Sequence, residues 1–262
     1  MHGRGYQTSF GPPVTPRIVK NLMIANAAIF VAQFVAPIIY EFGVVTPEAT
    51  WLWLQLWRPF TYMWLHAGPM HLAFNMLALW MFGSPLALYW GEQRFLKYYA
   101  VCGVGAGFLI ASVPMLPILA GWGPAFGSIG IPTLGASGAV MGVLLAFSFT
   151  WPDRTIQLLF PPIPLKAIWL IPLLLFFELF SGPSNVSHLG HLGGVAVGWI
   201  YLVNEGKTPG APNLRTLKLR YQRYTMRKKL RAVHDEARRE REGRGPKGRG
   251  PGDRPNDDRT YH

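Results

Sequence analysis

Residues 135–151, Gly-Ala-Ser-Gly-Ala-Val-Met-Gly-Val-Leu-Leu-Ala-Phe-Ser-Phe-Thr-Trp, open with a serine motif and continue as an apolar run without a charged residue. A second stretch, residues 188–194 (His-Leu-Gly-His-Leu-Gly-Gly), opens another apolar run further along the chain. Ser137 and His191 therefore lie inside segments apolar enough to enter a bilayer. Polar residues are costly to bury there and usually mark a functional site, so this placement points to chemistry within the membrane.

The composition describes an apolar body with a basic tail. Half of the 262 residues are hydrophobic and 15% are charged, whereas soluble domains average about 25% charged residues. Residues 1–204 hold eight Lys/Arg and five Asp/Glu, a net charge of +3, and residues 205–262 hold seventeen and eight, a net charge of +9. The single cysteine, Cys102, cannot form an internal disulfide. The first twenty residues lack the apolar core of a signal peptide, so we expect the first apolar segment to be a permanent anchor.

Six segments are candidate membrane spans. They run near residues 19–41, 70–90, 94–119, 137–151, 166–181 and 187–204. The predicted fold is an all-α integral membrane protein with a six-helix bundle over 19–204. A short segment over 1–18 precedes the bundle, and a basic tail over 205–262 follows it. The Gly/Pro/Arg-rich part of the tail is expected to be disordered.

The distribution of Lys and Arg among the loops predicts the orientation. The loops over 42–69, 120–136 and 182–186 contain one basic residue, Arg58, while the other loops and the tail are richer in Lys and Arg. By the positive-inside rule, both termini are cytoplasmic and these three loops face outward. The predicted location is the inner (plasma) membrane of the cell. Residues 51–58 contain three tryptophans and Arg58, a composition typical of a loop at the membrane–water interface.

The tail over 213–242 mixes apolar residues with many Lys and Arg at roughly helical spacing. This pattern is typical of a surface helix attracted to anionic lipid, although a solvated helix explains it equally well. A nucleic-acid partner is not expected, because no nucleic-acid-binding fold accompanies the basic residues.

Residue counting places three polar side chains at a similar depth. An α-helix rises about 1.5 Å per residue. Ser137, His191 and Asn75 are therefore expected at about 24, 20 and 26 Å from the inner ends of their helices. A serine hydroxyl becomes a good nucleophile when a base, most often histidine, accepts its proton. Ser137 and His191 are thus a candidate catalytic pair, and no carboxylate is expected beside them.

Acyl transfer also requires hydrogen-bond donors for the developing oxyanion. His71 and Asn75 are four residues apart and so share one face of a helix. The backbone N–H of Ser137 lies at a predicted helix N-terminus, where such groups are unpaired and favour negative charge. These three donors form a candidate oxyanion site.

Two alternatives need no serine chemistry. Gly138 and Gly142 are four residues apart, as are Gly194 and Gly198. Small residues at this spacing are common wherever membrane helices pack closely. The histidines at 66, 71, 188 and 191 are also candidate ligands for a metal or haem. The sequence contains no His-Glu-x-x-His motif and no acid near these histidines to complete a zinc protease site. We expect neither a metal nor another cofactor.

Taken together, the motifs resemble the rhomboid intramembrane serine proteases of prokaryotic type. The residues that carry the resemblance are Trp57-Arg58, His66, His71, Asn75, Gly135-Ala136-Ser137-Gly138, His191-Leu192-Gly193-Gly194 and Gly198. They stand in the family's order and spacing across about residues 19–204. The resemblance implies a six-helix bundle, with Ser137 as nucleophile and His191 as general base.

The same resemblance implies roles for the remaining motif residues. His71, Asn75 and the serine backbone would form the oxyanion site. Trp57 and Arg58 would belong to a membrane-embedded first loop. His66 would be a structural residue near the site.

Two positions depart from the family pattern. Ala87 stands where the family often has a glutamate, and Met141 stands where an aromatic residue often packs on the histidine. Methionine can fill such a gap flexibly.

The predicted function is cleavage of transmembrane protein substrates near their outer ends. Entry is expected beside the fifth span, where Phe176, Phe177 and Phe180 form either an apolar gate or a lipid-facing surface. A catalytically inactive relative that escorts membrane clients is the main rival.

Overall fold

The computed structural model describes residues 11–123, 129–157, 163–180 and 187–206, together with 222, 225–227, 230 and 234. The predicted surface helix over 213–242 and the disordered end of the tail therefore lie almost wholly outside the described residues. The α-helices are α1 (Arg17–Val35), α2 (Pro37–Gly43), α3 (Pro47–Trp51), α4 (Arg58–Thr61), α5 (Pro69–Ala78), α6 (Ser84–Trp90), α7 (Glu92–Ser112), α8 (Met115–Leu119), α9 (Ser137–Thr150), α10 (Leu170–Phe180) and α11 (Ser187–Glu205). Shorter elements are the 3₁₀ turns η1 (Tyr62–Trp64) and η3 (Ala167–Trp169) and the π-helical turn η2 (Leu79–Gly83).

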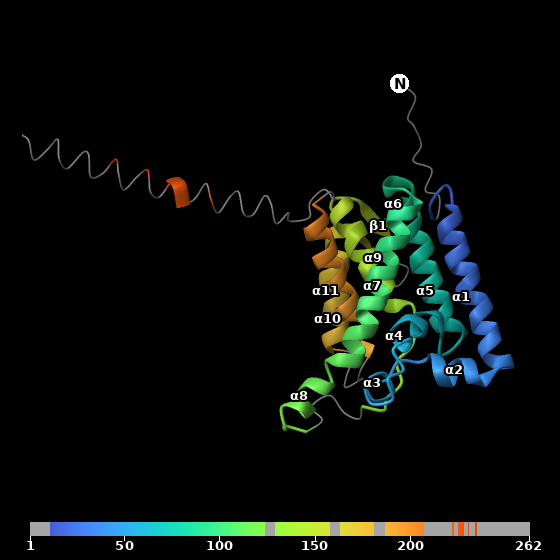
Figure 1. Ribbon diagram of the computed structural model, residues 1–262. Coiled ribbons are helices and arrows are strands. Elements are labelled where there is room, and N and C mark those ends of the chain that lie inside the picture. Colours follow the sequence, from blue (N-terminus) through green and yellow to red (C-terminus); the bar gives the residue numbers. More distant parts are fainter. Residues whose placement is uncertain are drawn as a thin grey trace, which may run out of the picture. The chain divides into compact units, whose positions relative to one another are not determined.

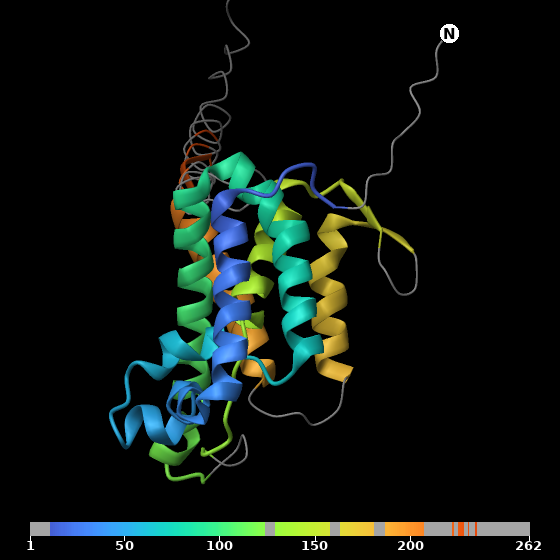
Figure 2. The same ribbon diagram turned by 90° about the vertical axis from the view of Figure 1, so that its right-hand side faces the viewer.

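The long helices run side by side, and the short helices gather at one end of them. Figures 1 and 2 show α1, α5 with α6, α7, α9, α10 and α11 lying alongside one another, with α2, α3, α4 and α8 at the same end of the bundle. Within the described residues, three helical segments are long and apolar enough to cross a membrane, namely Arg17–Val35, Pro69–Trp90 and Glu92–Leu119. Shorter apolar helices cover Ser137–Thr150 and Ala167–Phe176. The chain is thus mostly helical, as the sequence predicts.

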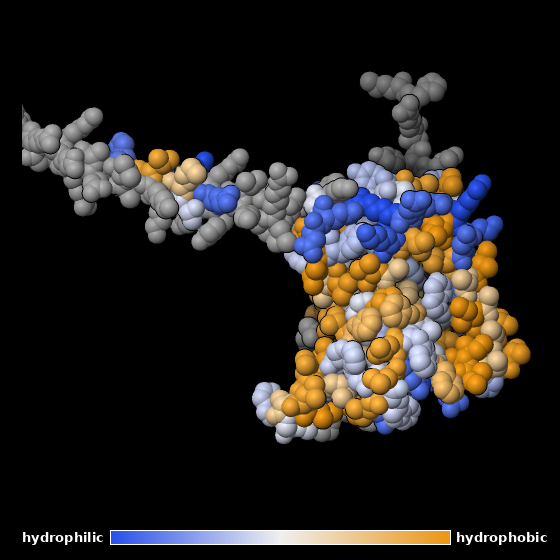
Figure 3. Space-filling view, in the orientation of Figure 1, coloured by the Kyte–Doolittle hydropathy of each residue, from blue (hydrophilic) through white to orange (hydrophobic). Residues whose placement is uncertain are grey.

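Hydrophobic side chains cover the flanks of the bundle, as expected for a surface in contact with lipid. Figure 3 shows hydrophilic residues gathered in a band at the end opposite the short helices, where α6 meets α7. Exposed apolar side chains on α1, such as Val31 and Phe34, belong to these flanks. An outward-facing apolar surface is the normal state of a helix in hydrocarbon.

Two prolines change the helices that the sequence pattern predicts as continuous. The first span is predicted over 19–41, but α1 ends at Val35 and α2 begins at Pro37. Ala36 leaves the helical region because the ring of a following proline clashes with a helical residue before it. In the second span, Pro85 lacks the N–H needed for a regular helical hydrogen bond, and the π-helical turn η2 lies directly before α6.

The all-α prediction is wrong at one loop. Between α9 and η3, β1 (Thr155–Gln157) and β2 (Pro164–Lys166) pair as a two-stranded antiparallel sheet, with Thr155 opposite Lys166. The ammonium of Lys166 lies 3.1 Å from a carboxylate oxygen of Asp153. The charged side chains of Asp153, Arg154 and Lys166 at the base of this hairpin are costly to bury in hydrocarbon and favour a position at the membrane surface.

The centre of the molecule is the group of three helices α7, α9 and α11, which pack on one another. Almost every side chain of α9 is buried. The hydroxyl of Tyr98 on α7 donates a hydrogen bond to the carbonyl oxygen of Gly142 on α9 at 2.7 Å. Small residues allow these close approaches, because a Cβ at Gly142 would collide with Cys102 and one at Gly198 would collide with Tyr98.

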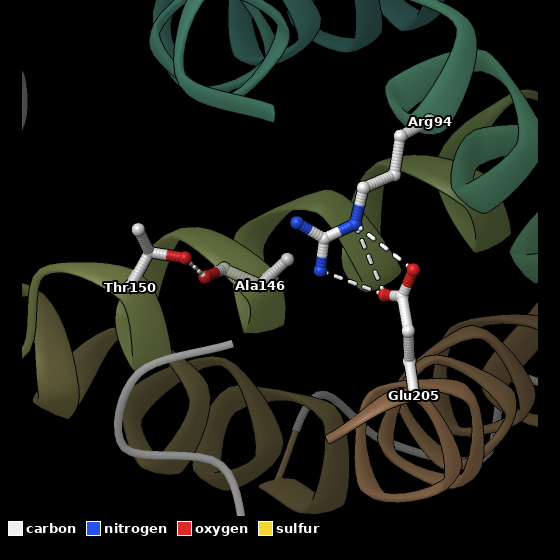
Figure 4. Close-up of polar contacts among 4 residues, drawn as sticks. All are labelled: Arg94, Ala146, Thr150 and Glu205. Atoms are coloured by element: carbon white, nitrogen blue, oxygen red, sulfur yellow. Dashed lines mark hydrogen bonds and ion pairs between the residues drawn. The ribbon is translucent and has the colours of Figure 1, made fainter. Parts of the chain in front are cut away.

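An ion pair joins the ends of α7 and α11 at the hydrophilic end of the bundle. Figure 4 shows Arg94 facing Glu205, with Nη2 2.7 Å from Oε2 and Nε 3.0 Å from Oε1. The Arg94 guanidinium also lies 4.3 Å from the ring centroid of Trp90. On α9 in the same view, the Thr150 hydroxyl donates to the carbonyl oxygen of Ala146 at 2.7 Å. The bidentate Arg94–Glu205 pair fixes the start of α7 beside the end of α11.

Candidate active site

The serine and histidine singled out in the sequence lie next to each other. Ser137 is the first residue of α9, and His191 lies one turn inside α11. The distance from Ser137 Oγ to His191 Nε2 is 2.9 Å, although 54 positions separate the two residues in the chain. That is hydrogen-bond distance for a hydroxyl nucleophile and the base that takes its proton.

Backbone contact between α9 and α11 sets this distance. A Cβ built on Gly194 would collide with the carbonyl oxygen of Gly138, which is the residue after the serine. The two helices therefore touch backbone to backbone within one turn of Ser137 and His191. Gly138 and Gly194, which could serve helix packing alone, therefore also position the serine–histidine pair. No side-chain hydrogen bond is needed for this approach, because glycine removes the steric barrier.

A glycine also makes room for a second histidine beside the serine. Gly135 has a φ of +124°, a backbone conformation that L side chains rarely adopt. A Cβ at Gly135 would lie 2.9 Å from Nε2 of His71 and 3.7 Å from Oγ of Ser137. The His71 ring and the serine hydroxyl therefore flank the same point of the backbone.

The loop that carries Gly135 is tied to the first loop of the chain. The Gly135 N–H donates to the carbonyl oxygen of Tyr62 at 2.9 Å, and Thr133 and Val45 form an isolated antiparallel bridge. The hydroxyl of Tyr62 reaches the carbonyl oxygen of Gly103 on α7 at 2.7 Å. The segment leading into Ser137 is thus bonded to the first loop at Val45 and at Tyr62, and Tyr62 is in turn bonded to α7.

Asn75 lies one turn after His71 on α5 and is buried. Its Nδ2 donates to the carbonyl oxygen of His71 at 3.0 Å. An amide nitrogen carries two hydrogens, so this bond leaves a second hydrogen for another acceptor. The bond also fixes the orientation of the buried amide.

His66 is completely buried, and its ring lies edge-on to His71 with 5.1 Å between the centroids. Neither ring nitrogen of His66 has a hydrogen-bond partner in the described part of the chain. His66 is therefore a packing neighbour of His71.

Trp57 and Arg58 hold the first loop through its backbone. The indole N–H of Trp57 donates to the carbonyl oxygen of Phe42 at 3.0 Å. Arg58 is buried and donates from Nη1 to the carbonyl oxygen of Val44 and from Nε to the side chain of Gln55, both at 2.5 Å. Both side chains organise the loop and do not bond to Ser137 or His191. The exposed indoles of Trp51 and Trp53 suit the interfacial position predicted for this stretch.

Sequence reasoning missed Gln33. This α1 residue is buried, and its side chain bonds to the backbone of His66 at two points. The available signal was a polar residue within an otherwise apolar helix, which usually has a specific partner.

The two departures from the family pattern are both buried. Ala87 lies within α6 and Met141 one turn after Ser137 on α9, so each fills space inside the protein. Of the three phenylalanines predicted as a gate, Phe176 is 53% exposed. The side chains of Phe177 and Phe180 lie outside the described residues.

For the alternative of a metal site, the described residues contain no group of three or more His, Cys, Asp or Glu side chains that could hold an ion. His66 and His71 are neighbours, with 5.1 Å between their ring centroids.

Comparison with known proteins identifies one family. The family model described as "Rhomboid domain" matches residues 54–206, which include every motif residue discussed above. Among individual proteins, the chain is 35% identical over 135 residues to "Rhomboid protein 1, mitochondrial" of Saccharomyces cerevisiae, covering 50% of this chain and 36% of that protein. It is 33% identical over 145 residues to "Rhomboid protease GluP" of Bacillus subtilis, covering 55% of this chain and 25% of that protein.

A plant protein gives a similar result. The chain is 32% identical over 151 residues to "RHOMBOID-like protein 1" of Arabidopsis thaliana, covering 57% of this chain and 35% of that protein. The matched region thus spans between a quarter and just over a third of the length of these relatives.

Proposed function

The chain belongs to the rhomboid family, and from that premise we propose that it is an intramembrane serine endopeptidase. The carrying observation is the 2.9 Å distance between Ser137 Oγ and His191 Nε2, within the region matched by the family. The name of a relative, Rhomboid protease GluP, agrees with this activity. The proposed protease domain covers residues 19–204, between the N-terminal segment and the basic tail.

In the proposed reaction, Ser137 Oγ attacks the carbonyl carbon of a substrate peptide bond. His191 Nε2 accepts the hydroxyl proton as the bond forms and then delivers it to the leaving amine. Water, deprotonated by the same imidazole, releases the acyl group and regenerates the serine. His71, Asn75 and the Ser137 N–H supply hydrogen bonds to the oxyanion in both steps.

The position of the pair predicts where the substrate is cut. Ser137 begins α9 at the end of the bundle near the short helices, opposite the hydrophilic band. With both termini cytoplasmic by the positive-inside rule, this end faces outward. A transmembrane substrate would be cut near its outer end after local unwinding, because a helical peptide bond is shielded by its hydrogen bonds. Six spans in the plasma membrane complete this proposed arrangement.

Substitution of the serine tests the function. A transmembrane substrate is incubated with wild-type protein and with Ser137→Ala in detergent and in liposomes. We expect the substitution to abolish cleavage and to leave the apparent melting temperature nearly unchanged, since only a hydroxyl is removed. A Ser137→Ala activity within tenfold of wild type would exclude this serine as the nucleophile.

A fluorophosphonate probe distinguishes the protease from an inactive relative that escorts membrane clients. The probe should label wild type at Ser137 and leave Ser137→Ala unlabelled. A folded wild-type protein that neither reacts with the probe nor cleaves any transmembrane substrate would favour the inactive relative.

A further inference from the structure

One amide side chain from α1 holds the peptide group that leads into the candidate oxyanion site. Gln33 Nε2 donates to the carbonyl oxygen of His66 at 2.7 Å, and Gln33 Oε1 accepts from the N–H of His66 at 3.3 Å. Gln33 is 9% exposed. Both ends of its amide are therefore used on the backbone of a single residue, away from water.

The next N–H of the chain points at the ring of His71. Ala67 N lies 3.4 Å from Nδ1 of His71, in donor geometry. The carbonyl of His66 and the N–H of Ala67 belong to the same peptide unit, which is planar and rigid. By fixing the carbonyl end of this unit, Gln33 also fixes the direction of its N–H end.

This N–H determines which nitrogen of His71 carries the proton. A backbone N–H can only donate, so Nδ1 must present its lone pair to Ala67. The neutral imidazole then holds its single proton on Nε2, as the hydrogen-bond network requires. Nε2 is the nitrogen beside Gly135 and Ser137, where an oxyanion would form.

The opposite tautomer would be harmful at this place. With the proton on Nδ1, the nitrogen facing the serine would present a lone pair to the developing negative charge. Donors that stabilise an oxyanion must be oriented before the charge forms. The His66 ring packs against the His71 ring, but packing alone does not distinguish the two tautomers, since they have the same shape.

We propose that Gln33 is a positioning residue for the oxyanion site, which holds the His66–Ala67 peptide so that His71 donates from Nε2. Gln33 acts through the peptide and does not touch the substrate. Its kinetic consequence rests on the proposed protease function, whereas the tautomer of His71 can be measured without any activity.

The first test reads the tautomer directly. Protein labelled with ¹⁵N-histidine in detergent is compared by NMR as wild type, Gln33→Leu and Asn26→Leu, with His71→Ala used to assign the His71 signals. Asn26 is a matched control, because it is also a buried polar residue of α1 and its Nδ2 bonds within its own helix to the carbonyl oxygen of Leu22. We expect His71 to be protonated on Nε2 in wild type and Asn26→Leu, and to become a mixture of tautomers in Gln33→Leu.

The second test reads the reaction. Gln33→Leu should lower kcat by about 10- to 100-fold, somewhat less than the loss of a whole oxyanion donor. KM should change by less than about threefold, because the donor acts in the transition state. In the His71→Ala background, the same substitution should change the remaining kcat by less than about twofold, since the two residues act in one chain of contacts.

Three results would overturn the proposal. They are a His71 signal unchanged by Gln33→Leu, a wild-type His71 already protonated on Nδ1, and an equal fall in kcat with and without His71. The last result would assign Gln33 to general stability of the α1 contact. If Gln33→Leu shows the expected tautomer shift but the wild type cleaves no substrate, the result would instead count against the protease function and leave the positioning of His71 intact.

Discussion

The two sides of the candidate site are held by different kinds of force. On one side, α9 and α11 touch through glycine backbones, and Ser137 and His191 meet as a consequence. On the other side, the His71 ring of α5 accepts a hydrogen bond from the peptide that Gln33 of α1 holds, and Asn75 donates to the backbone carbonyl of His71 within α5. The first side depends on the absence of side chains and the second on the presence of polar ones.

The two sides should therefore respond differently to substitution. Added volume between α9 and α11 separates the nucleophile from its base and also weakens the fold, since backbone atoms cannot move aside cheaply. Removal of a polar group on the α5 side leaves the packing nearly intact and lowers catalysis alone. Four predictions test this contrast, from the largest expected effect to the smallest.

His191→Ala removes the base from the glycine-packed side. We expect kcat/KM to fall by about 10⁴-fold or more, because serine and base act as a unit. His188→Ala is the matched control, as it lies three residues earlier on α11. It should keep activity within about tenfold of wild type, measured by cleavage of a transmembrane substrate. An inactive His188→Ala beside an active His191→Ala would assign the base to the other histidine.

Gly194→Ala tests the backbone contact. The new methyl would overlap the carbonyl oxygen of Gly138, so we expect a loss of about 1–3 kcal/mol of stability or more. Both the apparent melting temperature and the cleavage rate should fall. At Gly190, a Cβ would lie 3.1 Å from Cδ1 of Ile110, a flexible side-chain end that can shift. Gly190→Ala should therefore cost less, and equal shifts in the two variants would contradict the contrast.

Asn75→Ala tests the hydrogen-bonded side. We expect kcat to fall by about 10- to 1000-fold, the range for loss of one oxyanion donor. KM and the melting temperature should change little, because the donor matters mainly in the transition state. Michaelis–Menten measurements with a transmembrane substrate separate the two parameters. A loss confined to KM would show that Asn75 holds substrate or structure instead.

Deletion of residues 213–262 should have the smallest effect on the site. All the proposed site residues precede this segment, so cleavage in detergent should remain within about twofold of wild type. The isolated tail should bind anionic liposomes more weakly as salt rises, because each basic residue contributes about 1 kcal/mol of screened attraction. Equal binding to neutral liposomes, or an inactive truncated protein, would contradict a peripheral role for the tail.

Much of the helical framework can be predicted from the sequence, because it depends on local pattern. Apolar run length located α9 and α11 to within one residue at each end, whereas the predicted span over 94–119 covers both α7 and the short helix α8. The break at Ala36 had a local signal in Pro37 that the predicted span over 19–41 overlooked. The hairpin of β1 and β2 had none strong enough, since three-residue strands carry too little alternation to be recognised.

The sequence by itself determined which residues are available for chemistry, since a serine and histidines in apolar helices stand out against their surroundings. Only the tertiary structure decided that Ser137 Oγ and His191 Nε2 lie 2.9 Å apart, because helix packing alone sets the distance between residues so far apart in the chain. It also decided that Gln33 reaches the backbone of His66. That contact joins two segments 33 residues apart, and no local pattern records which backbone a buried amide will meet.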